Sequence, residues 1–78
     1  MQNLDARLQP LFQAVFDLPP GTDIPAVRQE QVPAWDSMAH ISLVAALESE
    51  FNIAIDAGDS MLLTSYRATR EYLEGLNG

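Results

Sequence analysis

The sequence predicts an all-α fold, a small four-helix bundle of three main helices and one short helix with a long loop between helices one and two. Apolar residues recur every three or four positions in three stretches, which is the spacing of one helix face. The only β-like stretch, Ile53-Ala54-Ile55, has no partner strand and is expected to be an extended connector. With 78 residues, 47% of them hydrophobic, the chain can fill one core, so residues 1–78 form a single domain.

The first helix is expected where six apolar residues form one stripe: Leu4, Leu8, Leu11, Phe12, Val15 and Phe16. Pro10 removes one backbone hydrogen bond inside this stripe. Because the stripe continues across it, we expect one kinked helix rather than a helix that is well formed only from Gln9. Leu18-Pro19-Pro20-Gly21 then ends the helix.

Between residues 22 and 34 we expect an ordered loop of about thirteen residues, although loops this long are often either functional or disordered. Its apolar residues Ile24, Val27 and Val32 are expected to pin it across the end of the bundle.

The second helix is expected from Ser37 to about Phe51, with Asp36 as its N-cap. Its apolar stripe consists of Ile41, Leu43, Val44, Ala46, Leu47 and Phe51. Residues 56–59 should turn, and residues 60–63 should form one or two helical turns.

The last helix is expected to be capped by Thr64 or Ser65 and to close the bundle with four residues: Tyr66, Tyr72, Leu73 and Leu76. Gly75 and Gly78 should fray its end.

Charge and cysteine content exclude several classes of function. Four basic and eleven acidic residues give a net charge of −7, which disfavours nucleic acid and anionic membrane surfaces and favours partners with basic patches. Without cysteine, and with a single histidine, no disulfide framework or structural zinc site is expected. No secretion signal or membrane-spanning stretch is visible, so we expect a cytoplasmic protein without membrane contact.

Ser37 is the most informative residue. It lies in the first turn of the best predicted helix, where its hydroxyl should point into solvent. A phosphate attached there would interact favourably with the positive end of the helix dipole. This position suits a tethered anionic cofactor and does not indicate a catalytic nucleophile.

The pattern around Ser37 resembles the acyl carrier protein family, also called the phosphopantetheine-binding or thiolation-domain family. The resemblance rests on Asp36-Ser37-Met38 followed by Ile41, Leu43-Val44, Ala46-Leu47-Glu48 and Phe51, and it extends over nearly the whole chain.

The resemblance implies a carrier, not an enzyme. Ser37 would receive 4′-phosphopantetheine from coenzyme A through a dedicated phosphopantetheinyl transferase. Asp36 would cap the helix and contact the transferase or its metal, and Met38 replaces the leucine that contacts the transferase and the arm. The arm would hold acyl or aminoacyl groups as thioesters and present them to ligases, acyltransferases or synthases with basic docking patches. We expect a monomer without a metal of its own.

Departures from the family pattern indicate a specialised discrete carrier. Ala39, Ser42 and Ser49 are neutral where carriers of bulk fatty-acid synthesis place acids, and Trp35 replaces a small residue. We therefore expect a role in polyketide, nonribosomal-peptide or modified-lipid assembly rather than in bulk fatty-acid synthesis.

Two surfaces follow from this interpretation. Residues expected at the docking surface are Trp35, His40, Ile41, Val44 and Glu48. For Trp35 we favour covering the end of the bundle over direct partner contact, and for His40 a solvated or partner-contacting ring over acid–base chemistry. An acyl-chain cleft between helices two and three is expected near Val44, Leu47, Ile55, Met61 and Leu62. Met38 and Met61 suit a docking surface or the core equally well.

Two other classes remain open. One is an acidic helical adaptor that binds a basic partner and is never modified. The other is a hydrolase built on Ser37 and His40, which the sequence supports weakly because it offers no third residue and no Gly-x-Ser-x-Gly turn.

Overall fold

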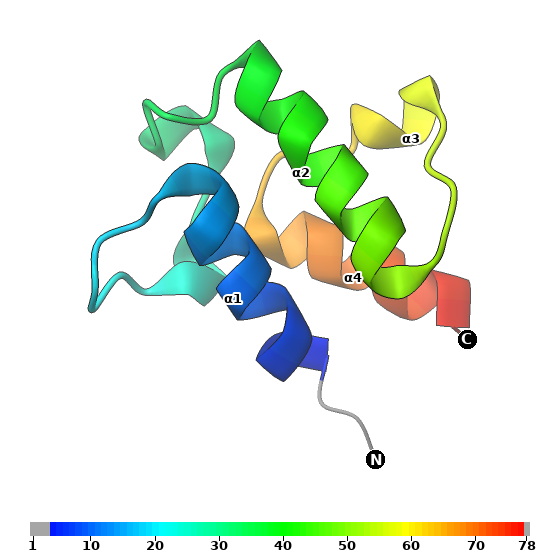
Figure 1. The fold of residues 1–78 in the computed structure, drawn as a ribbon, viewed down its shortest axis with the longest axis horizontal. Helices are drawn as coiled ribbons and strands as arrows, with labels where there is room; N and C mark the ends of the chain where they lie inside the picture. Colours follow the sequence, from blue (N-terminus) through cyan, green and yellow to red (C-terminus); the bar gives the residue numbers. More distant parts are fainter. Residues whose placement is uncertain (1–3, 78) are drawn as a thin grey trace.

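A computed structural model describes residues 4–77, and these form an all-α bundle, as the sequence predicts. Its helices are α1 (Leu4–Phe16), α2 (Ser37–Phe51), α3 (Ala57–Ser60) and α4 (Tyr66–Asn77). Two short 3₁₀ turns, η1 (Ile24–Ala26) and η2 (Gln29–Gln31), lie in the long loop (Figure 1). No strand forms within residues 4–77, and residues 53–55 are extended, as expected.

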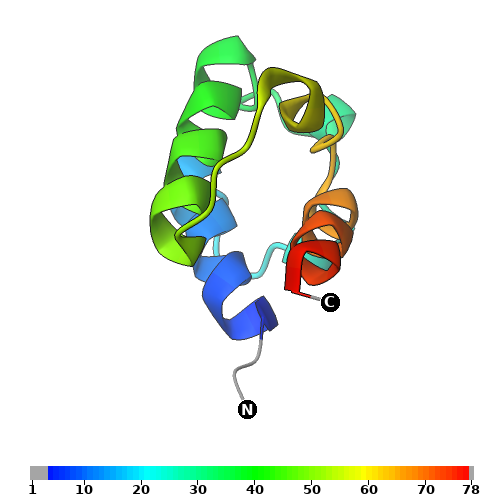
Figure 2. The ribbon, with the colours of Figure 1, turned by 90° about the vertical axis from the view of Figure 1, so that its right-hand side faces the viewer.

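The helices surround one core. α1 packs against both α2 and α4, and Figure 2 shows α1 and α2 together on one side with α4 on the other. α3 and the η2 part of the long loop lie at the end of the bundle where α2 begins, whereas η1 lies farther along, against α4 and α1 (Figures 1 and 2).

α1 is continuous across Pro10, as predicted, and Pro10 is exposed. The helix buries Leu8, Phe12 and Phe16. The Phe12 ring has edge-on or tilted contacts with three other rings, those of Phe16, Trp35 and Tyr66, at centroid distances of 5.6, 5.7 and 5.2 Å. These are the arrangements that aromatic side chains prefer. An aromatic cluster therefore joins α1 to Trp35, which lies just before α2, and to Tyr66, the first residue of α4.

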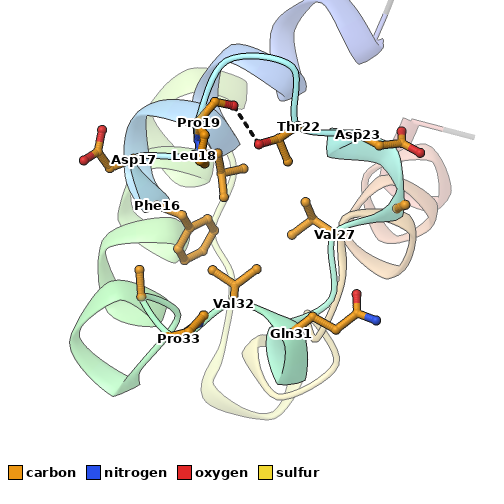
Figure 3. A pocket seen from close by; sticks show the side chains of 12 residues that line it. Phe16, Asp17, Leu18, Pro19, Thr22, Asp23, Val27, Gln31, Val32 and Pro33 are labelled. Carbon is orange, nitrogen blue, oxygen red and sulfur yellow. Dashed lines mark hydrogen bonds between the residues drawn. The ribbon is translucent and has the colours of Figure 1, made fainter.

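The long loop is ordered around the end of α1. Ile24 and Val27 are buried and Val32 is half-buried, so the expected pinning by apolar residues is confirmed. The N–H of Tyr66 donates to the Val27 carbonyl at 2.9 Å, which ties the loop to the start of α4. The loop curves around a hollow, which Figure 3 shows from close by.

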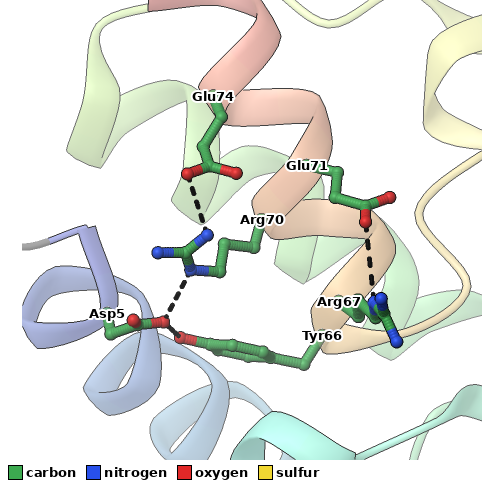
Figure 4. Close-up of polar contacts among 6 residues, drawn as sticks. All are labelled: Asp5, Tyr66, Arg67, Arg70, Glu71 and Glu74. Carbon is green, nitrogen blue, oxygen red and sulfur yellow. Dashed lines mark hydrogen bonds and ion pairs between the residues drawn. The ribbon is translucent and has the colours of Figure 1, made fainter.

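A polar network joins α1 to α4 (Figure 4). The Tyr66 hydroxyl donates to the Asp5 carboxylate, and Arg70 Nε donates to the same oxygen at 3.0 Å. Arg70 also pairs with Glu74 at 2.8 Å. The hydrogen bond from Tyr66, followed by that from Arg70, lowers the pKa of Asp5. Burial and the Asp5 carboxylate raise the pKa of Tyr66.

α2 buries Leu43 and Leu47, with Ala46, Val44 and Phe51 partly buried. The predicted stripe was wrong at Ile41, which is 69% exposed. The helix ends at Asn52, whose left-handed backbone (φ 54°) turns the chain so that the N–H of Ile53 donates to the Glu48 carbonyl at 3.2 Å.

The short helix differs from the prediction. α3 begins at Ala57 rather than at Ser60, because the Asp56 carboxylate caps it by accepting from the Asp59 N–H at 2.7 Å. Residues 61–62 form a turn instead of continuing the helix.

α4 begins as predicted, and Ser65 is its cap: the Ser65 hydroxyl accepts from the Ala68 N–H at 3.0 Å. Tyr66 and Leu73 are buried, but Leu76 is 50% exposed and does not close the bundle. The helix continues through Gly75 without fraying there, and Gly78 lies outside the described residues.

Candidate functional site

Ser37 is the first residue of α2, and its side chain is exposed. The Asp36 carboxylate accepts a hydrogen bond from the Ala39 N–H at 2.8 Å, so the predicted N-cap is confirmed. α2 is 15 residues long, and its dipole places partial positive charge beside the Ser37 hydroxyl. An anionic group on this hydroxyl would therefore be both accessible and electrostatically favoured.

His40, one turn beyond Ser37, joins α2 to α3. Trp35 Nε1 lies 2.9 Å from His40 Nδ1, and because an indole N–H can only donate, Nδ1 must accept. The proton of the neutral ring is therefore on Nε2, which lies 2.9 Å from the Ser60 carbonyl oxygen and 3.1 Å from the Ser60 hydroxyl. The two rings also stack, with centroids 6.2 Å apart.

These contacts confirm the favoured interpretation of Trp35 and give His40 a structural role. The Trp35 side chain is only 3% exposed and stacks on Phe16 at 4.4 Å, so it covers the end of the core and is removed from the docking surface. His40 is half-buried and its ring nitrogens have partners within the protein, so the expectation of a solvated ring was wrong, while contact with a partner protein stays a prediction. Both ring nitrogens are engaged with Trp35 and Ser60, so neither serves Ser37 as a general base.

A groove lies between α2 and α3, with a volume of about 270 Å³; we call it the α2–α3 groove. Its lining residues are Ile41, Val44, Ala45, Glu48, Ile55, Asp56, Ala57 and Ser60. Of the five residues expected in an acyl cleft, only Val44 and Ile55 line it. Leu47 is fully buried in the core, while Met61 and Leu62 follow α3 and are 78% and 60% exposed.

Glu48 was expected at the docking surface, and its side chain has a structural contact. Glu48 Oε2 accepts from the Ile55 N–H at 2.8 Å, which holds the extended connector against α2. The residue is half-buried and also lines the α2–α3 groove.

Exposed apolar side chains surround this end of the molecule. Met38 is 78% exposed, as is Met61, so both belong to the surface and not to the core. Together with Ile41 and Leu62 they lie in the first half of α2 and directly after α3, two segments that the His40–Ser60 contact brings together. We call the set Met38, Ile41, Met61 and Leu62 the apolar face.

The charges are unevenly distributed. Every arginine of the chain pairs with a carboxylate: Arg7 with Glu50, Arg28 with Glu30, Arg67 with Glu71, and Arg70 with Asp5 and Glu74. Within residues 4–77, six acids have no ion pair: Asp17, Asp23, Asp36, Glu48, Asp56 and Asp59. Four of these lie on α2 or α3 or just before them. The apolar face is therefore bordered by acids without a paired base.

One of the largest hollows in the structure was not predicted from the sequence. It has a volume of about 540 Å³ and lies between the end of α1 and the long loop (Figure 3). Its main lining side chains are those of Phe16, Leu18, Val27, Val32 and Pro33, and we call it the loop pocket. The apolar residues of the loop indicated that their own side chains would be buried. Whether a hollow forms among them depends on how the loop curves, which the sequence does not show.

Comparison with known proteins gives no family assignment: no protein-family model matches the chain, and no curated protein matches it. Within residues 4–77, no helix has the length and apolar character needed to cross a bilayer. Nor does that part of the chain bring together three acidic or histidine side chains that could hold a metal ion.

Proposed function

We propose that this protein is an acyl or aminoacyl carrier whose 4′-phosphopantetheine arm is attached to Ser37. The observation that carries the proposal is the exposed Ser37 hydroxyl at the first turn of α2, behind the Asp36 cap. These residues fit the group, because a phosphodiester on this hydroxyl would lie at the positive end of the helix dipole.

The residues around Ser37 position the arm and do not perform chemistry. A phosphopantetheinyl transferase would form the bond between Ser37 Oγ and the phosphorus of coenzyme A. The pyrophosphate bond would break, adenosine bisphosphate would leave, and the hydroxyl proton would pass to a base of the transferase. The terminal thiol of the arm would then carry the acyl group as a thioester. Asp36 fixes the helix start, and Met38, beside Ser37, offers the transferase an exposed apolar contact.

Partner enzymes would dock on the apolar face. Its exposed side chains favour an apolar contact, and the bordering acids Asp36, Asp56 and Asp59 favour a basic rim on the partner. Ala39, Ser42 and Ser49 leave the length of α2 less acidic. This pattern supports a specialised carrier for polyketide, nonribosomal-peptide or modified-lipid assembly, which we propose to be a cytoplasmic monomer.

The test is the intact mass of the protein after incubation with coenzyme A, magnesium and a promiscuous phosphopantetheinyl transferase. The wild type should gain one phosphopantetheine, and Ser37→Ala should gain none. Ser42→Ala is the matched control, because Ser42 is also an exposed serine on α2, and this variant should be modified like the wild type.

Other outcomes would refute the carrier. A folded wild type that stays unmodified with this transferase and with that of its host would favour the unmodified acidic adaptor. Equal modification of Ser37→Ala would place the arm elsewhere. Turnover of a simple ester that disappears in Ser37→Ala would instead indicate a hydrolase.

A further inference from the structure

The interior of the loop pocket is formed by uncharged side chains that converge on one space. Phe16, Leu18 and Val27 form its floor and are 3%, 8% and 6% exposed. In Figure 3 the side chain of Val32 points into the hollow. An apolar interior of this kind, with few polar groups, selects an apolar occupant, and a volume of about 540 Å³ leaves room for even the largest side chain.

The rim of the loop pocket is fixed by hydrogen bonds on several sides. The Leu18 N–H donates to the Gln13 carbonyl at 3.1 Å, and the Thr22 hydroxyl donates to the Pro19 carbonyl at 2.6 Å. Farther along, the Trp35 N–H donates to the Val32 carbonyl at 2.9 Å. Because the hollow is framed by bonded backbone, an occupant can bind without first ordering the loop.

Two acids flank the opening of the loop pocket. Figure 3 shows Asp17 and Asp23 on opposite sides of the hollow, with their carboxylates turned away from its apolar interior. Both residues are exposed, and neither forms an ion pair with a base within residues 4–77. The charges at the opening therefore favour an occupant that carries a cationic group on each side of its apolar part.

The loop pocket is separate from the surface on which partner enzymes are proposed to dock. No residue of the apolar face lines it. Figure 1 shows the start of the long loop and α3 on opposite sides of the molecule. A partner can therefore occupy the loop pocket while the apolar face and Ser37 stay accessible.

We propose that the loop pocket is a second docking site, which receives an apolar side chain of a partner protein flanked on both sides by basic residues. In an extended segment every second side chain points to the same side. A central apolar residue and basic residues two positions before and after it would therefore all face this protein, the first in the pocket and the others beside Asp17 and Asp23. The site does not involve Ser37, so the proposal does not depend on the carrier function.

The probes are three pentapeptides with arginine at both ends, alanine at the second and fourth positions, and leucine, phenylalanine or tryptophan at the centre. Each is titrated into the unmodified, ¹⁵N-labelled protein and followed by NMR. At least one should bind with a micromolar to low-millimolar dissociation constant and shift the amide signals of Leu18, Val27 and Val32. Control peptides with glycine at the centre, or with glutamate at both ends, should not bind.

Two kinds of variant test the two parts of the site. Val32→Phe fills the pocket and should weaken binding about tenfold or more, whereas Val44→Phe, the matched control in the α2–α3 groove, should not change it. Asp17→Asn and Asp23→Asn should each weaken binding about two- to fivefold, as expected for exposed ion pairs. Glu71→Gln removes an exposed acid from α4 and should have no effect, which separates the local charges from the net charge. Circular dichroism verifies that each variant is folded.

Each of the other outcomes would overturn the proposal. Amide shifts confined to Met38, Ile41, Met61 and Leu62 would place the peptides on the apolar face. Equal binding of the peptides with central glycine would show that charge alone holds them, and no binding by any of the three probes would show that the pocket receives no such segment. All of these measurements use the unmodified protein, so the carrier proposal stands or fails separately, by the mass test of Ser37.

Discussion

Replacing His40 with phenylalanine should weaken the junction between α2 and α3. Phenylalanine keeps a flat ring that can stack on Trp35, but it removes the acceptor of the Trp35 N–H and the donor to the Ser60 carbonyl. Because the Trp35 side chain is 3% exposed, its N–H would be left buried without a partner, at a cost of about 1–3 kcal/mol. Losing the half-buried bond to Ser60 adds about 1 kcal/mol. We therefore expect His40→Phe to lower the free energy of unfolding by about 2–4 kcal/mol and the melting temperature by roughly 10–30 °C.

A double-mutant cycle isolates the hydrogen bond from the other effects of each substitution. Trp35→Phe removes the donor, and the double variant removes both partners, so that no buried group is left unpaired. The two changes should be less than additive, with a coupling energy of about 1–2 kcal/mol. Urea unfolding should be followed by circular dichroism, because Trp35 is the only tryptophan and fluorescence would be lost in half of the cycle.

A control cycle pairs Trp35→Phe with Ser42→Ala, an exposed position on the same helix. These two changes should be additive. If Trp35→Phe and His40→Phe were also additive within about 0.5 kcal/mol, the bond that the structure places between the two rings would not contribute to stability, and the argument would be refuted.

Two further predictions concern carboxylates with defined partners. Since hydrogen bonds from Tyr66 and Arg70 hold the pKa of Asp5 below its ordinary value of 3.8, the stability from this contact is fully present above pH 3.8 and is lost as the pH falls through the lower folded value. Asp5→Asn should therefore flatten the pH dependence of the free energy of unfolding below pH 3.8, and an unchanged slope in urea titrations would contradict this. At the helix start, Asp36→Ala should cost about 1 kcal/mol by removing the acceptor of the Ala39 N–H, whereas Asp36→Asn keeps an acceptor and should stay within a few tenths. Equal losses in the two variants would show that the charge matters to stability rather than the cap.

The sequence predicts those parts of the candidate site that depend on residues close together in the chain. The Asp36 cap and the exposed position of Ser37 follow from the order of residues at a helix start. The neighbours of Ser37 were harder to place. His40 was expected to be solvated or to contact a partner protein, yet its ring contacts Ser60, which comes from another helix. Likewise, helical period grouped Ile41 with the buried residues of α2, but Ile41 lines the open α2–α3 groove and is 69% exposed.

The sequence by itself determined the helix content, the extent of α2 and the cap at Asp36, and it placed the start of α4 after Thr64 or Ser65. These features depend on apolar spacing and on hydrogen bonds between residues a few positions apart, so they are local. Only the tertiary structure decided that Trp35 lies in the core, that His40 joins α2 to α3, and that the long loop curves around a pocket. Those features depend on which distant segments meet, because a side chain is buried or paired only when another part of the chain covers it.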